Sequence, residues 1–196
     1  MNYLAHAYLS FDHPSILVGN MISDFVKGKS RYTYPFAIQK GIELHRAIDT
    51  YTDSHPAIHQ AKEIFRPAYR LYSAPIIDVV FDHFLANDIN VFEEGALYNF
   101  SEGVYLQLEN NSTHLPSYFL QVLTYMKSEN WLFNYRNTDG IEKSLRGLIR
   151  RATFVHESNT AFKLFNANYA DLNTIYHSFF PDVEYFAKEK IKELVT

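Results

Sequence analysis

Apolar side chains recur every three or four residues along most of the chain, and the alternation typical of β-strands is scarce. Only seven glycines and seven prolines interrupt this pattern in 196 residues, and they do not gather into a linker. This length suits one domain with its own core. We therefore predict a single all-α domain over residues 1–196, with helices near 1–10, 14–27, 35–54, 56–71, 75–91, 95–110, 116–129, 138–151, 154–166 and 169–193.

Composition excludes several classes of protein. The chain has no cysteine, which rules out disulfide bonds and thiolate catalysis. It has no apolar run of the roughly 20 residues that a membrane span needs, and its first residues lack the pattern of a signal peptide. A formal net charge of −4 disfavours nonspecific binding to nucleic acid. We expect a cytoplasmic protein that binds neither nucleic acid nor membrane; its oligomeric state stays open.

The acidic residues are distributed unevenly along the chain. Residues 1–88 contain seven aspartates and two glutamates, whereas residues 89–196 contain three and ten, and six of the nine histidines precede residue 84. Aspartate is the poorer helix former, so a solvated helical surface favours glutamate. Helix caps explain some of the aspartates but not Asp49, Asp78 and Asp82, which lie inside helical patterns. Aspartate close to histidine is typical of a metal site.

Two aspartates of the expected helix 75–91 give the strongest physical signal. Asp78 and Asp82 are four residues apart and share one face of a helix that is apolar almost all round, and His83 follows directly. Like charges on one buried face repel each other and resist desolvation. A divalent metal ion would remove both costs, so this pattern favours metal binding over a purely structural network.

Further candidates lie on the earlier helices. His45 and Asp49 share a face of the helix 35–54, which fits either an ion pair within the helix or a metal site. Asp24 and Lys27 fit a surface ion pair or, together with Asn20 on the same face as Asp24, a site for metal and phosphate. His6 stands alone among apolar residues and becomes a candidate only if its helix faces that of Asp24.

Together these residues suggest a site that several helices build in the interior of a bundle. Inward-facing aspartates and histidines would suit a divalent cation with open positions for water and substrate, and such sites usually perform hydrolysis. Carboxylate ligands favour Mn²⁺ or Mg²⁺, and histidine leaves Fe²⁺ and Zn²⁺ as alternatives. No glycine-rich phosphate loop or serine nucleophile motif competes with this interpretation.

Seven segments spread over nearly the whole chain form a recognisable set of motifs. They are N-Y-L-A-H (2–6), G-N-x-x-x-D-F-V-K-G (19–28), G-I-x-x-H-R-x-I-D-x-x-T-D (41–53), D-x-x-x-D-H-F-L (78–85), F-R-x-x-x-R (65–70), S-E-N-W-L-F-N-Y-R (128–136) and, more weakly, P-x-x-x-Y-F (181–186). Together they resemble the acyl carrier protein phosphodiesterases, distant relatives of the HD-domain phosphohydrolases. The resemblance implies an HD-like helical fold and a Mn²⁺-dependent hydrolase that removes 4′-phosphopantetheine from holo-acyl carrier protein.

The resemblance also implies roles for individual residues. Lys27 and Arg46 would hold phosphate oxygens, and the general acid stays open between Asp53 and His83. The implied catalytic residues are Asp24, Lys27, Arg46 and Asp53, and the implied metal ligands are Asp24, His45, Asp49, Asp82 and His83, with His6 and Asp78 as ligands or supporting residues.

An acidic carrier protein would require a basic docking face. The region after residue 147, which is basic in relatives, contains only Arg150 and Arg151 before it turns neutral. Two alternatives remain: a hydrolase of nucleotides or other small phosphoesters, and a helical binding protein without catalysis. The basic candidates for docking are Lys27, Lys29, Arg31, Arg66, Arg70, Arg146, Arg150 and Arg151.

Overall fold

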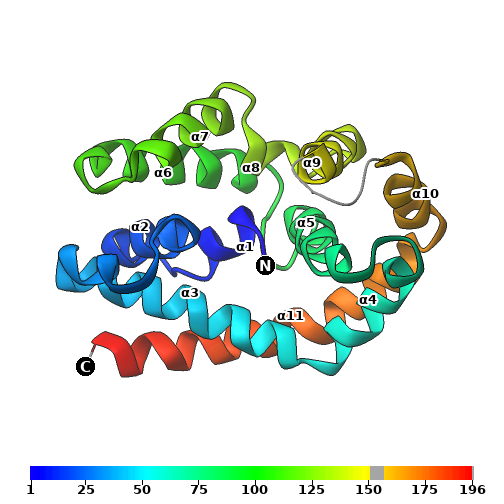
Figure 1. The fold of residues 1–196 in the computed structure, drawn as a ribbon, viewed down its shortest axis with the longest axis horizontal. Coiled ribbons are helices and arrows are strands. Elements are labelled where there is room, and N and C mark those ends of the chain that lie inside the picture. The colour runs from blue at the N-terminus through cyan, green and yellow to red at the C-terminus, as the bar shows by residue number, and fades with distance from the viewer. Residues whose placement is uncertain (151–156, 196) are drawn as a thin grey trace.

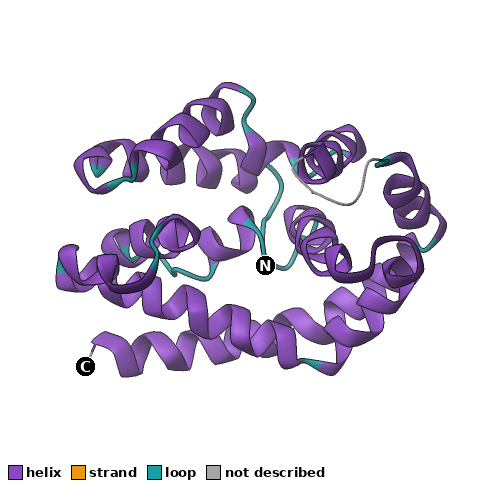
Figure 2. Cartoon of the chain, viewed as in Figure 1, coloured by secondary structure: helices purple, strands orange, loops and turns teal. Residues whose placement is uncertain are grey.

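Helices account for nearly all of residues 1–150 and 157–195, the part of the chain that the computed structural model describes (Figure 2). No strand and no helix long and apolar enough to cross a membrane occurs in this part. The α-helices are α1 (Tyr3–Tyr8), α2 (Pro14–Ile22), α3 (Phe36–Ser54), α4 (Pro56–Tyr69), α5 (Ser73–Ala86), α6 (Ala96–Asn110), α7 (Ser117–Ser128), α8 (Trp131–Asn134), α9 (Thr138–Arg150), α10 (Asn159–Ala167) and α11 (Tyr169–Val195). Short 3₁₀ helices are η1 (Ser23–Phe25), η2 (Gly28–Thr33), η3 (Arg70–Tyr72) and η4 (Ser112–His114).

The predicted all-α class is confirmed, and most expected helices appear within a few residues of their predicted ends. The expected helix 14–27 is too long, because α2 ends at Ile22 and the chain continues through η1 into extended backbone. The ring centroids of Phe25 and Phe119 lie 5.1 Å apart, and Arg46 donates a hydrogen bond to the carbonyl oxygen of Val26. These tertiary contacts override the helical pattern. The expected ends at 151 and 154 lie outside the described residues.

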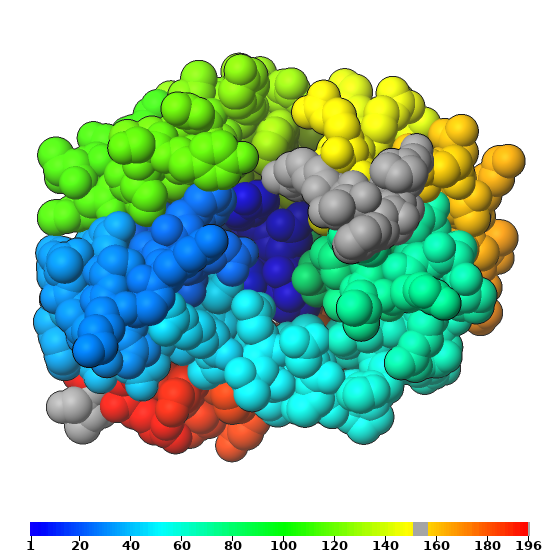
Figure 3. Space-filling model, in the orientation of Figure 1, coloured from blue at the N-terminus to red at the C-terminus, as the bar shows by residue number. Residues whose placement is uncertain are grey.

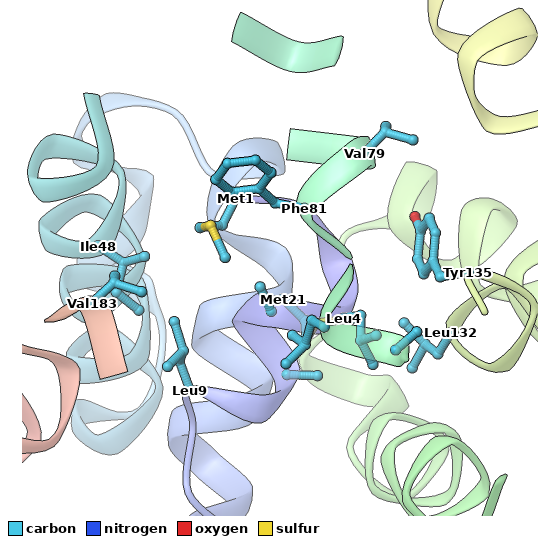
Figure 4. Packing of buried hydrophobic residues seen from close by; sticks show 14 of the residues in the cluster. Met1, Leu4, Leu9, Met21, Ile48, Val79, Phe81, Leu132, Tyr135 and Val183 are labelled. Carbon is cyan, nitrogen blue, oxygen red and sulfur yellow. The ribbon is translucent and has the colours of Figure 1, made fainter. Parts of the chain in front are cut away.

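One long apolar cluster runs through the bundle, and α1 lies in the middle of it (Figure 1). Figure 4 shows side chains from α1, α2, α3, α5, α8 and α11 in this core, with Leu4 of α1 near the centre of the group. Helices α3 and α11 lie side by side along one edge of the molecule. A helix as short as α1 cannot be stable alone, so its neighbours must hold it in place.

Helices α2 and α3 approach each other so closely that their backbones touch. A Cβ atom added to Gly19 would lie 2.7 Å from Gly41 Cα, and one added to Gly41 would lie 2.3 Å from the carbonyl oxygen of Ile16. Only glycine can occupy both positions at this separation. The contact places residue 20 of α2 directly beside the face of α3 that carries His45.

Candidate metal centre

A hollow lies at the centre of one face of the molecule (Figure 3). Residues near the N-terminus form its floor, and segments of α2, α3 and α5 surround it. The first residues of the chain therefore meet α3 and α5, the two helices that carry most of the predicted site residues.

Two buried histidines, one from α1 and one from α3, lie against each other. His45 belongs to the buried face of α3, where Ile38, Ile42 and Ile48 recur at helical spacing. His6 comes from α1, and its ring stacks on that of His45 with centroids 3.9 Å apart and planes 15° apart. The rings are only 3% and 5% exposed by residue, so whatever their nitrogen atoms face must satisfy them.

One nitrogen of each ring is held by Asn20. His45 Nδ1 lies 2.7 Å from the main-chain oxygen of Asn20, and His6 Nδ1 lies 2.8 Å from its side-chain Oδ1. A carbonyl oxygen can only accept, so Nδ1 of both rings carries a proton. In their neutral forms, both histidines therefore present a bare Nε2.

The Nε2 atoms face carboxylates. His45 Nε2 lies 3.1 Å from Asp49 Oδ2 and 3.2 Å from Asp24 Oδ1, and His6 Nε2 lies 3.2 Å from Asp49 Oδ1. Asp49 stands one helical turn after His45 on α3, and Asp24 reaches the site from η1. The side chain of Asp24 is 75% exposed and that of Asp49 is 40% exposed, so the carboxylates line the solvent side.

The charges of this cluster differ sharply between the two rings. Burial lowers the pKa of His45, but contacts with Asp24 and Asp49 outweigh it and raise the value to about 9. Burial and the neighbouring charge of His45 lower the pKa of His6 to about 4. Burial raises the pKa of Asp49, yet the two histidines hold it below its ordinary value. A proton shared with His45 thus balances the carboxylates in the metal-free protein.

The donor atoms fit a divalent cation. One ligand atom each from His6, His45 and Asp49 lies within 4.8 Å of the others, the only such set of three among the described residues. His6 Nε2 is buried and has no hydrogen-bond partner, although Asp49 lies beside it. Two imidazole nitrogens that face carboxylate oxygens, one bare and one able to release its proton, are the mixed donor set that divalent metals use, with positions left open for water and substrate.

The predicted carboxylates of α5 lie next to this cluster but have other partners. Asp82 is fully buried and accepts hydrogen bonds from the amides of Leu4 (2.8 Å) and Ala5 (3.2 Å) in the first turn of α1. Asp78 forms an ion pair of 2.9 Å with the α-ammonium of Met1, which also lies 3.8 Å from Asp49. Burial raises the pKa of Asp82 to about 7, against the opposing effect of the two amides.

Comparison with known proteins places the chain. The family model described as "Acyl carrier protein phosphodiesterase" matches residues 1–183 of this chain. Curated proteins of that name include one from Enterobacter sp. (33% identical over 97% of this chain and 99% of the relative), one from Escherichia coli O157:H7 (33%, 92% and 94%) and one from Photorhabdus laumondii (31%, 92% of each). The chain belongs to this family.

Membership in the acyl carrier protein phosphodiesterase family confirms the resemblance and supports an enzyme over a passive helical binding protein. No solved structure matches the chain. The likeness to the HD-domain fold therefore stays a prediction.

His83 is not brought into the cluster. Its Nδ1 lies 2.7 Å from the carbonyl oxygen of Tyr135 and its Nε2 lies 2.9 Å from the hydroxyl of Tyr169. The ring packs among Phe84, Phe165 and Tyr169, and burial lowers its pKa. Because both nitrogen atoms have protein partners, the ring ties α5 to the end of α8 and the start of α11.

The remaining predicted residues lie at the edges of the site. Arg46 bonds the carbonyl oxygen of Val26 at 3.1 Å, which holds it close to the segment that carries Asp24 and Lys27. Lys27 is exposed, and no partner is recorded for its ammonium in the described chain. Asp53 is exposed and pairs with Lys62 at 2.8 Å, one turn of α3 beyond Asp49.

The contact of Asn20 with both histidines was not predicted from the sequence. Asn20 is fully buried, and its side chain contacts both α1 and the following turn. The available signal was an amide in the apolar stretch Ile16–Ile22, because a buried amide must find partners. What the sequence could not reveal was that both partners are histidines.

Proposed function

We propose that this protein is a metal-dependent phosphodiester hydrolase that removes 4′-phosphopantetheine from holo-acyl carrier protein. The observation that carries the proposal is the pair of Nε2 atoms, from His6 and His45, that face Asp49, the first of them bare and the second with a proton that a metal ion can displace. The substrate is proposed from the name that the family and its known members carry.

His6, His45 and Asp49 would hold the cation, and Asp24 would complete the site from the rim. We propose Mn²⁺, with Mg²⁺, Fe²⁺ and Zn²⁺ as alternatives, because imidazole and carboxylate donors together suit all four ions. A cation bound there would make a coordinated water more acidic and would neutralise charge on the phosphodiester. Asp24, which is largely exposed and within 3.2 Å of His45, would orient that water and accept its proton.

Lys27 and Arg46 would bind the phosphate oxygens. The bond from Arg46 to Val26 fixes the arginine beside the backbone that carries Lys27. Lys27 and Arg46 therefore lie close in the chain or in space to the segment that carries Asp24. Arginine and lysine are the usual partners of phosphate groups, since each can donate several charge-assisted hydrogen bonds.

The carrier protein would dock on the rim formed by residues 25–42. This stretch contains four cations and no acidic residue, in a chain whose net charge is −4. Lys29 is exposed, and Arg31 is partly exposed and lies over the ring of Tyr32. Of the other predicted docking residues, Arg66 and Arg146 pair with Glu63 and Glu142. Arg70 ends α4 and Arg150 ends α9, away from this rim, and Arg151 lies outside the described residues.

The mass of the carrier protein tests the reaction directly. Holo-acyl carrier protein is incubated with the enzyme and Mn²⁺ and then weighed by mass spectrometry, with a chelator in the control. Loss of the phosphopantetheine mass supports the proposal. An unchanged mass together with turnover of small phosphoesters would point instead to a hydrolase of small substrates.

Charge reversal tests the docking rim separately from the chemistry. The double variant Lys29→Glu/Arg31→Glu should raise KM for holo-acyl carrier protein by about tenfold and leave kcat nearly unchanged, since rim charges act mainly on association. Arg66→Glu/Arg146→Glu changes the net charge equally and serves as the control. Equal effects of the two double variants would contradict docking on this rim.

A further inference from the structure

Asn20 contacts both histidines of the cluster through different groups. Its side-chain Oδ1 lies 2.8 Å from His6 Nδ1, and its main-chain oxygen lies 2.7 Å from His45 Nδ1. The two rings are thereby connected to one residue of α2, although they come from α1 and α3. The residue is fully buried, so no water competes for these bonds.

The orientation of the Asn20 amide follows from its partners. Its Nδ2 lies 2.8 Å from the carbonyl oxygen of His6, which can only accept a hydrogen bond. A second bond, of 3.1 Å, runs from Nδ2 to Ser10 Oγ, whose own hydroxyl donates to that same carbonyl at 2.8 Å. The amide group cannot be flipped without placing oxygen against oxygen. Oδ1 must therefore face His6 Nδ1, which must carry the proton.

Without this acceptor, nothing would favour the proton of neutral His6 on Nδ1 over Nε2. Its Nε2 lies 3.2 Å from Asp49 Oδ1, close enough for an Nε2–H group to turn toward that carboxylate. A ring protonated at Nε2 has no lone pair to offer a cation on that side. The choice between the two tautomers therefore decides whether His6 can be a ligand.

We propose that Asn20 is a positioning residue that fixes the Nδ1–H form of His6 through its side chain and of His45 through its main chain, so that both Nε2 atoms are directed at a metal ion. The close approach of Gly19 and Gly41 brings the main-chain carbonyl of Asn20 within reach of His45. This inference rests on the proposed metal site, but its first test does not require metal.

The test compares Asn20→Leu, which has nearly the same shape and no polar side-chain atom, with Asn20→Asp, whose neutral carboxyl form retains the oxygen acceptor and can donate its proton to the His6 carbonyl. Long-range ¹H–¹⁵N spectra of the histidine rings are recorded on metal-free protein. We expect wild type and Asn20→Asp to keep the His6 proton on Nδ1, and Asn20→Leu to move it to Nε2. His45 should keep its Nδ1 proton in all three, because its acceptor is main chain.

Metal affinity gives the second readout. Titration with Mn²⁺, followed by the electron paramagnetic resonance signal of the free ion, should show binding to Asn20→Leu weakened by about 10- to 100-fold, the usual effect of losing a residue that orients a ligand. Ser101→Ala removes another buried side-chain hydrogen bond, on α6, and controls for loss of stability alone.

Two results would overturn the proposal: a His6 tautomer that is unchanged in Asn20→Leu, or wild-type Mn²⁺ affinity in that variant. If wild type binds no divalent cation, the proposed function fails. The ring spectra of the metal-free protein still decide whether Asn20 sets the tautomer.

Discussion

The buried histidines His6 and His45 differ from the buried His83 in the partners of one ring nitrogen. All three rings are buried, and all three donate Nδ1–H to an oxygen that can only accept. The difference lies at Nε2. In His83 this atom receives a hydrogen bond from the Tyr169 hydroxyl, whereas in His6 and His45 it faces carboxylates that have no proton to give.

The neighbouring carboxylates show the same contrast. Both oxygens of Asp82 accept hydrogen bonds from fixed backbone amides, and Asp78 pairs with an ammonium group. Asp24 and Asp49 share only the ring nitrogen of His45 as a close partner on the site side. Polar groups whose hydrogen-bonding needs the fold meets are structural, whereas the groups of the His6–His45–Asp49 cluster have the donor atoms that a cation could use.

The largest expected effect comes from removing a ligand. His45→Ala deletes the ring that touches both Asp24 and Asp49, so Mn²⁺ affinity should fall by more than the roughly hundredfold that loss of a supporting residue can cause. Hydrolysis of holo-acyl carrier protein should fall below detection. Mn²⁺ titration and the mass assay measure the two losses, and circular dichroism checks the fold. Retained affinity would remove His45 from the site.

Asp82→Ala should act on stability more than on metal. It leaves the buried amides of Leu4 and Ala5 without acceptors, which costs about 3 kcal/mol of unfolding free energy at one to three per group. Urea denaturation measures this loss, and Mn²⁺ titration of the folded variant measures the other. Asp82→Asn, which keeps an acceptor, is the matched variant and should lose less. Lost metal binding at unchanged stability would restore Asp82 as a ligand, as the family resemblance implies.

The fold was largely predictable because helical periodicity is a local property of the sequence. Helix α3 begins within one residue of its predicted start and ends at its predicted residue. The errors lie where distant residues decide. Helix α2 stops early, and Arg46 of α3 donates a hydrogen bond to the carbonyl of Val26 in the extended segment that follows.

The site was predictable only in part, and the strongest physical argument was incomplete. Burial of Asp78 and Asp82 correctly demanded compensation, but a cation was not the only remedy, because the first turn of α1 supplies amides that no pattern in α5 could reveal. His6 had the weakest sequence argument, yet it is one of the three residues whose ligand atoms lie together. Helical spacing pairs residues within one helix, whereas this site joins three.

The pH dependence should separate the two functions of the His45 proton. Because the folded pKa is about 9 and the unfolded value is 6.5, the ion pairs of protonated His45 stabilise metal-free protein fully below pH 6.5, and this stability is lost as pH rises through 9. Mn²⁺ must displace that proton, so its affinity should rise roughly tenfold per pH unit toward pH 9. Urea denaturation and Mn²⁺ titration across this range should therefore show opposite slopes. Parallel slopes would contradict a shared site for proton and metal.

The smallest effect should come from His83→Asn, and it tests the contrast between the histidines most directly. The asparagine amide can still donate to the carbonyl of Tyr135, but the Tyr169 hydroxyl loses its acceptor. One such hydrogen bond contributes about 1 kcal/mol to the free energy of unfolding, so a modest loss in urea denaturation is expected. Mn²⁺ affinity and hydrolysis should match wild type, because no atom of this ring faces the carboxylates of Asp24 or Asp49. A large loss of metal binding at nearly unchanged stability would mean that His83 reaches the cation in another conformation. In that conformation, its hydrogen bonds with Tyr135 and Tyr169 would be exchanged for a bond to the metal.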